Sequence, residues 1–161
     1  MNRLVAFVLF LLCSTAEATQ QTPELFTGPS GTRGMLADPL FAARESDPTL
    51  WARFAKVLPK QTCSALWRGY IGTWDISNGE LRLLSIRTSD CKESKVVALP
   101  EVFPGAKGPV PATWYTGELL FEIGPYVPGP CGFSPTCPTE YEVIVIQKGK
   151  VIRNERRQHI R

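Results

Sequence analysis

The dipeptide Asn78-Gly79, which separates two runs of apolar residues, constrains the fold of this chain more than any other feature. Asn-Gly is the preferred pair for a two-residue hairpin turn, because both residues accept a positive φ. The sequence therefore predicts a β-hairpin with strands over Leu66–Ile76 and Leu81–Arg87, joined at this turn.

The register that this turn implies is consistent with the side chains it pairs. It places Trp74 opposite Leu83, Ile76 opposite Leu81, Ile71 opposite Ile86 and Asp75 opposite Arg82. Apolar residues thus meet apolar residues, and the charged pair joins opposite charges, which stabilises a ladder by roughly 0.2–1 kcal/mol. A shift of the register by one residue would mix the two faces, so the pattern favours this pairing.

Further strand-like segments follow the hairpin and indicate the fold class. They cover Lys95–Leu99, Thr113–Ile123, Tyr141–Gln147 and Lys150–Glu155, and Lys148-Gly149 is the turn between the last two. Val143–Ile146 is continuously apolar, as expected for a strand that is covered on both faces. We expect a mainly β fold, an antiparallel meander closed as a small barrel or sandwich, with short N-terminal helical segments.

Those helical segments are predicted before the hairpin. Asp38-Pro39 and Asp47-Pro48 each place an acidic N-cap before a proline at the first helical position. After the second pair, apolar residues recur at helical spacing until Pro59 ends the run. We expect this apolar stripe to pack on the sheet.

The first residues indicate export. A basic residue, Arg3, precedes an apolar run over Leu4–Cys13 and an Ala-x-Ala cleavage signal that ends at Ala18. The run is too short for a membrane-spanning helix, which needs about 20 residues. We expect a cleaved signal peptide, a periplasmic or secreted location and no stable membrane span after cleavage. A retained anchor and lipidation at Cys13 are the alternatives.

The domain organisation follows from these segments. Residues 1–18 are the expected signal peptide. Residues 19–37 are polar and rich in glycine and proline, which indicates an extended or mobile segment. Residues 38–161 are of a length that suits one domain, which we expect to be disulfide-bonded and mainly β.

Four cysteines remain once Cys13 leaves with the signal peptide, and an even number in an exported chain indicates two disulfides. The hairpin register brings Cys63 and Cys91 to its open end, and Cys131 and Cys137 are close enough in sequence to close a small loop. We therefore expect Cys63–Cys91 and Cys131–Cys137. A zinc site is the alternative, but no Cys-x-x-Cys spacing occurs, so we expect no metal.

The stretch Trp67–Ile76 (WRGYIGTWDI) and the following Gly79–Leu83 (GELRL) resemble a hairpin in an uncharacterised family of small bacterial proteins, with the motif WRGYxxTW…GxLxL. Phe103–Gly108 and the segment Trp114–Leu119 look like the continuation of that resemblance, which spans residues 63–152. The resemblance implies no established activity and no catalytic residues.

Several chemistries are disfavoured by the residues present. The only histidine, His159, lies near the C-terminus, so a Ser-His-Asp or Cys-His arrangement would have to use it. Glu118 and Glu122 share a strand face, but four strand positions separate them by roughly 13 Å, farther than glycosidase carboxylates. We predict no catalytic residues, no cofactor and, given the export signal and a net charge of +3, no nucleic-acid binding.

Aromatic residues supply the binding candidates. Trp67, Arg68 and Tyr70 lie in the first hairpin strand, and Tyr126 and Phe133 lie in Gly124–Pro138, a Gly/Pro-rich loop that encloses two cysteines. Such rings can form a recognition surface. The alternative is packing, with the loop covering an open end of the barrel.

The function expected from these features is binding. We predict a non-catalytic exported interaction protein, one form of which is an inhibitor or immunity-type binder of another exported or envelope protein. The alternative is a carboxylate-dependent enzyme acting on cell-envelope carbohydrate. The segment from Lys148 to Arg161 carries six basic residues against Glu155 alone, and either binds an acidic partner or is a solvated end.

Overall fold

A computed structural model describes residues 21–131 and 134–158 of the chain. The expected signal peptide, Phe133 and His159 lie outside these residues. The strands are β1 (Glu24–Gly28), β2 (Gly31–Met35), β3 (Tyr70–Ser77), β4 (Glu80–Ser89), β5 (Ser94–Val97), β6 (Val110–Pro111), β7 (Gly117–Cys131), β8 (Ser134–Gln147) and β9 (Lys150–Gln158). The helices are α1 (Pro39–Ser46), α2 (Pro48–Phe54) and α3 (Leu99–Val102). The fold is mainly β, as predicted.

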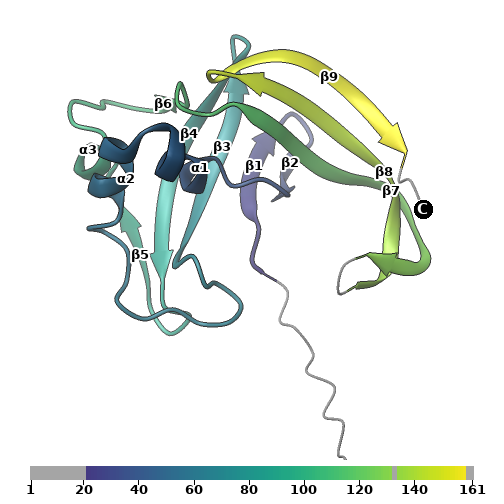
Figure 1. The fold of residues 1–161 in the computed structure, drawn as a ribbon, viewed down its shortest axis with the longest axis horizontal. Coiled ribbons are helices and arrows are strands. Elements are labelled where there is room, and N and C mark those ends of the chain that lie inside the picture. The colour runs from purple at the N-terminus through teal and green to yellow at the C-terminus, as the bar shows by residue number, and fades with distance from the viewer. Residues whose placement is uncertain (1–20, 132–133, 159–161) are drawn as a thin grey trace, which may run out of the picture.

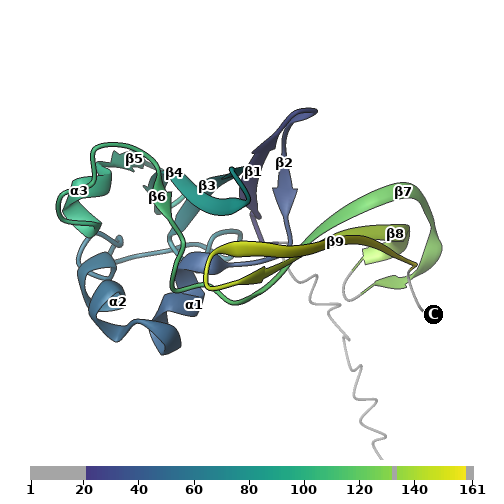
Figure 2. The same ribbon diagram turned by 90° about the horizontal axis from the view of Figure 1, so that it is seen from above.

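The strands form one mixed sheet in the order β2-β1-β3-β4-β9-β8-β7, and β5 and β6 also pair with β4. β1 runs parallel to β3, which is possible because the helical connection between them is long enough for a crossover. β9 pairs with β4 only at Glu80 and Lys150, and beyond that point the two halves of the sheet diverge (Figures 1 and 2). The predicted antiparallel meander closed as a small barrel or sandwich is corrected in two respects, because the sheet is mixed and is not closed as a barrel.

The predicted hairpin is confirmed as β3–β4. Asn78 and Gly79 have φ values of 53° and 74°, as the turn requires, and Trp74 lies opposite Leu83. Arg82 Nε donates to Asp75 Oδ1 at 2.9 Å. A β-bulge between Thr73 and Trp74 shifts the rest of the ladder by one residue.

Two details of that hairpin differ from the prediction. The bulge places Ile71 opposite Arg87 instead of Ile86. The first strand begins at Tyr70 and not at Leu66, because Cys63 and Leu66 form a separate bridge in the segment before it. Both differences lie on the side of the bulge that is remote from the turn, where the turn no longer sets the pairing.

Both predicted helix starts are confirmed. The Asp38 carboxylate accepts a hydrogen bond from Phe41 N at 3.0 Å, and the Asp47 carboxylate accepts one from Leu50 N at 2.9 Å. These bonds satisfy backbone donors that the first turn of a helix leaves free. The two short helices cover the sheet on the side of β3 and β4 and place Leu40, Leu50 and Phe54 in the core.

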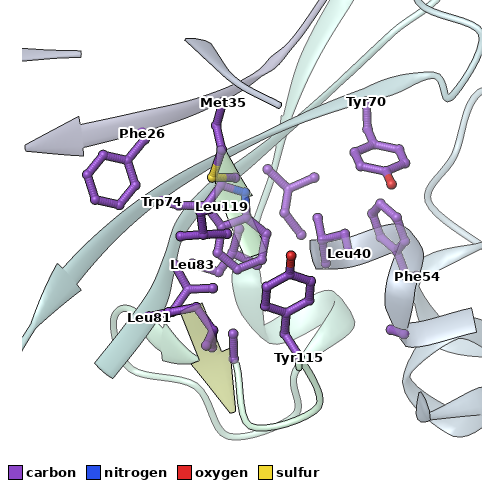
Figure 3. Close-up of a cluster of buried hydrophobic side chains, with 14 of the residues drawn as sticks. Phe26, Met35, Leu40, Phe54, Tyr70, Trp74, Leu81, Leu83, Tyr115 and Leu119 are labelled. Carbon is purple, nitrogen blue, oxygen red and sulfur yellow. The ribbon is translucent and has the colours of Figure 1, made fainter. Parts of the chain in front are cut away.

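The segment that we expected to be extended or mobile contributes to the sheet. Residues 24–35 form the hairpin β1–β2, and Glu24, Phe26 and Met35 are buried. The polar, glycine-rich composition of the segment gives little sequence evidence for a hairpin, because few of its side chains reach the core. Figure 3 shows Met35 beside Trp74, the largest fully buried side chain.

The predicted loop over Gly124–Pro138 is also different in the structure. β7 and β8 continue through it as an antiparallel ladder that extends to Cys131 and Ser134, with irregularities between Ile123 and Tyr126 and between Pro128 and Cys131. Together with β9 they form a three-stranded ribbon that projects away from the helices (Figures 1 and 2). We call β7, β8 and β9 the β7–β9 ribbon.

Both predicted disulfides are present. Cys63 and Cys91 are joined with a Cα–Cα distance of 6.1 Å, and Cys131 and Cys137 with a distance of 5.2 Å. The first ties the segment before β3 to the end of β4, and the second closes the far end of the ribbon. Within the described residues, no helix has the length and apolar character needed to cross a membrane.

Candidate functional site

Two of the predicted binding residues, Arg68 and Tyr70, are enclosed. Tyr70 is fully buried, and only 10% of the Arg68 side chain is exposed. Tyr70 donates its hydroxyl to Asp38 Oδ1 at 2.7 Å, and Arg68 Nη1 donates to Asp38 Oδ2 at 3.0 Å. Burial and the neighbouring Asp38 raise the pKa of the Tyr70 hydroxyl. These groups connect β3 to the start of α1 and do not form a contact surface.

Glu24 of β1 completes this buried cluster. Its Oε2 accepts hydrogen bonds from Trp74 Nε1 at 2.6 Å and from Gly72 N at 3.1 Å. Its Oε1 has no hydrogen-bond partner and lies 3.8 Å from Arg68 Nη2. Burial, followed by repulsion from Asp38, raises the pKa of Glu24 to about 8. The raised pKa favours the neutral, protonated form of this carboxyl group, whose hydrogen bonds tie β1 to β3.

Two other predicted residues are exposed, but on separate parts of the molecule. Trp67 is 54% exposed and packs edge-on against Phe41 of α1, with ring centroids 5.7 Å apart. Tyr126 is 55% exposed on β7, where its hydroxyl donates to Glu122 at 2.7 Å. The helices and the distal ribbon are drawn at opposite ends of the molecule in Figures 1 and 2. Trp67 and Tyr126 therefore do not share one surface.

A groove of about 670 Å³ lies instead between β2 and one face of the β7–β9 ribbon. Side chains and backbone from all four strands line it, namely Arg33, Ile123, Gly124, Glu140, Glu142, Asn154 and Arg156. We call it the ribbon groove. In Figure 1 the β1–β2 hairpin is drawn beneath the arch of the ribbon.

Three of the four charged side chains of the ribbon groove have a polar partner, and for Glu140 that partner is the neutral Gln158. The guanidinium of Arg33 stacks 3.8 Å from the centroid of the Phe121 ring and forms an ion pair with Glu142 at 2.6 Å. Asn154 Nδ2 also donates to Glu142, at 3.2 Å. Glu140 accepts from Gln158 Nε2 at 2.9 Å.

Arg156 is the exception. It lies opposite Glu142 in the β8–β9 ladder and is exposed, yet in the described part of the chain it makes no side-chain hydrogen bond and no ion pair. Its neighbour Glu142 is already engaged by Arg33 and Asn154. A guanidinium with five free donors suits a carboxylate or phosphate, which it can bind through two parallel hydrogen bonds.

The opposite face of the ribbon satisfies its own charges. Both terminal nitrogens of Arg157 donate to Glu118, each at 2.7 Å, and Arg157 Nε donates to Glu155 at 2.7 Å. Hydrogen bonds from Arg157 lower the pKa of Glu118. Arg153 forms an ion pair with Glu155 at 2.8 Å. The positive charge left on β9 beyond Val151 is therefore that of Arg156.

The residues that line the groove are not apparent from the sequence. The basic C-terminal segment was recognised, and the structure places residues 150–158 of it in a strand paired with β8. Because side chains alternate between the two faces of a strand, the sequence indicates that Asn154, Arg156 and Gln158 share one face of β9. Arg33 could not be found in this way, because its contacts lie far along the chain.

Within the described residues, no group of three or more His, Cys, Asp or Glu side chains could hold a metal ion. A scan against protein-family models, a search of curated proteins and a search of solved structures each give no match to this chain. The function has to be inferred from the geometry of the chain.

Proposed function

We propose that this chain is a non-catalytic exported protein that binds another exported or envelope protein through the ribbon groove. The observation that supports this most is Arg156, which among the described charged side chains of the groove has neither an ion pair nor a hydrogen bond. A surface of this kind gains a charge-assisted contact only when a partner supplies the anion. Two disulfides, which are typical of extracellular and periplasmic proteins, support the exported location.

The geometry favours binding over the carboxylate-enzyme alternative. A glycosidase needs one carboxyl group that holds a proton and a second that acts on the opposite side of the scissile bond. Glu140 and Glu142 both line the groove, but each accepts a hydrogen bond from a neighbouring side chain, and Glu142 is ion-paired with Arg33. Glu118 and Glu122 point to the other face of the ribbon, where Arg157 and Tyr126 engage them.

Partner capture with charge-reversed variants tests the proposal. The oxidised chain purified after export is immobilised and exposed to an envelope extract, alongside Arg156→Glu and the matched control Arg87→Glu, an exposed arginine on β4. We expect a partner to be retained by the original chain and by the control, and to be lost from Arg156→Glu. Equal capture by all three proteins would show that the groove is not the site. Hydrolysis of envelope glycan that disappears in Glu142→Gln would establish the enzyme instead.

A further inference from the structure

The β7–β9 ribbon has two outer edges that are largely free of strand partners. On the β7 side, Leu36 N donates to Leu120 O, and the described part of β7 beyond Leu120 pairs only with β8. On the β9 side, β4 pairs only at Lys150. An unpaired edge presents a row of N–H and C=O groups that can pair with another extended chain.

The two edges differ in proline content. β7 carries Pro125, Pro128 and Pro130 beyond Leu120, and proline has no N–H to donate to a ladder. β9 contains no proline from Lys150 to Gln158. The β7 edge is thus protected against strand addition, while the backbone of β9 keeps all of its donors.

The side chains of β9 indicate what kind of strand can be added. Residues on the outer face, Arg153, Glu155 and Arg157, are held in ion pairs with each other and with Glu118. On the groove face, Asn154 and Gln158 donate to carboxylates of β8, and Arg156 is free. A strand added beside β9 would place alternate side chains on the groove face, where an acidic one can reach Arg156.

A second copy of this chain is a poor occupant of the same edge. Antiparallel pairing of β9 with β9 centred on Glu155 or Arg156 would oppose like charges, and pairing centred on Asn154 would leave Arg156 facing Ile152 without an anion. An acidic partner has the complementary charge.

We propose that the partner contributes an extended, acidic, proline-free segment that adds as a strand to the outer edge of β9 over residues 153–158, with a carboxylate bound by Arg156. This proposal rests on the proposed function and specifies how the partner is recognised. Main-chain hydrogen bonds would supply affinity, and the alternate side chain that enters the ribbon groove would supply specificity.

Selection from a library of random displayed peptides tests strand addition without knowledge of the natural partner. Peptides are selected on the oxidised exported chain and then measured against Arg156→Glu and the control Arg87→Glu. We expect enriched peptides to be acidic and free of proline, and to bind Arg156→Glu about tenfold to a hundredfold more weakly while binding the control equally.

Backbone methylation of a selected peptide separates strand addition from simple groove binding. N-methylation of the peptide residues whose N–H groups face β9 should abolish binding. N-methylation of the alternate residues, whose N–H groups face away from β9, should be tolerated. Amide hydrogen exchange should slow at alternate residues over 153–158 when the peptide is bound.

Each other outcome has a definite meaning. Peptides that depend on Arg156 but tolerate methylation at every nitrogen would overturn strand addition and leave the proposed function intact. Failure to enrich peptides, or enrichment of proline-rich or basic ones, would also overturn strand addition. If neither the peptides nor the captured envelope protein depends on Arg156, the proposed function fails as well.

Discussion

Replacing Glu24 by glutamine should remove most of the pH dependence of stability near neutrality. Glutamine has nearly the same shape, and its amide oxygen can accept the hydrogen bonds from Trp74 Nε1 and Gly72 N that Glu24 Oε2 accepts. It cannot ionise, so it never places a negative charge in the core beside Asp38. The substitution therefore changes the ionisation of the site and leaves its packing in place.

The sign and size of the effect follow from proton linkage. The pKa of Glu24 is raised from 4.5 to about 8, chiefly by burial. Between these values the folded chain holds a proton that the unfolded chain releases, so the free energy of unfolding falls as the pH rises. The stabilisation is fully present below the unfolded pKa, is lost as the pH rises through the folded pKa, and amounts to a few kcal/mol by linkage.

Urea unfolding with both disulfides intact, repeated at several pH values between the two pKa values and above the higher one, measures this. We expect the original chain to lose stability with rising pH and Glu24→Gln to give a nearly flat profile. Glu45→Gln, at an exposed glutamate of α1, is the matched control and should follow the original chain. Parallel profiles for Glu24→Gln and the original chain would refute the assignment of a neutral, buried Glu24.

Three further predictions concern stability and can be checked by the same unfolding assay. Trp74→Ala should lower the free energy of unfolding by about 3–5 kcal/mol, because the side chain is fully buried, and a loss below about 1 kcal/mol would contradict its place in the core. Gly79→Ala should lower it by about 1–2 kcal/mol through the positive φ of 74° alone, since a Cβ there meets nothing within 4 Å; an unchanged stability would contradict the turn conformation. Replacing Cys63 and Cys91 together by serine should destabilise by roughly 3–4 kcal/mol, and replacing Cys131 and Cys137 by less, because the sequence separations are 28 and 6; the reverse order would count against the chain-entropy explanation.

Local rules recovered the features that depend on residues close in sequence. The turn at Asn78-Gly79, the two aspartate helix caps and the Cys131–Cys137 disulfide follow from neighbouring residues, and Cys63–Cys91 follows from the hairpin register that the turn sets. Each is present in the structure. The β1–β2 hairpin was missed because it is held by parallel pairing with β3 and by the buried Glu24, which no local pattern reveals.

The same dependence on distant contacts explains why Arg68 and Tyr70 were predicted as binding residues although both are enclosed. Alternation along one strand indicates that two side chains share a face, but not whether another element covers that face. Here Phe54 of α2 packs on Tyr70, and Asp38, the N-cap of α1, lies 30 and 32 positions away in sequence and accepts a hydrogen bond from each of the two side chains. A polar side chain whose partner is distant thus resembles an exposed recognition residue when only the sequence is considered.

The ribbon groove depends on one inserted residue. From the turn at Lys148-Gly149, Gln147 pairs with Lys150 and Ile146 with Val151, but Val145 pairs with Arg153, so Ile152 is the extra residue of a bulge and is 58% exposed. Because side chains alternate between faces, an unbulged strand would turn every following residue of β9 to the other side.

That unbulged register would also pair the charges differently, because it would place Arg157 opposite Glu140 and Arg156 opposite Tyr141. It would place Glu155 opposite Glu142, two like charges in one cross-strand pair, and would point Arg156 away from the groove. The bulged register places Arg156 opposite Glu142 and leaves Glu155 beside Arg153 and Arg157. The bulge therefore decides which charged side chains of β9 share a face, and it presents Arg156 to the groove.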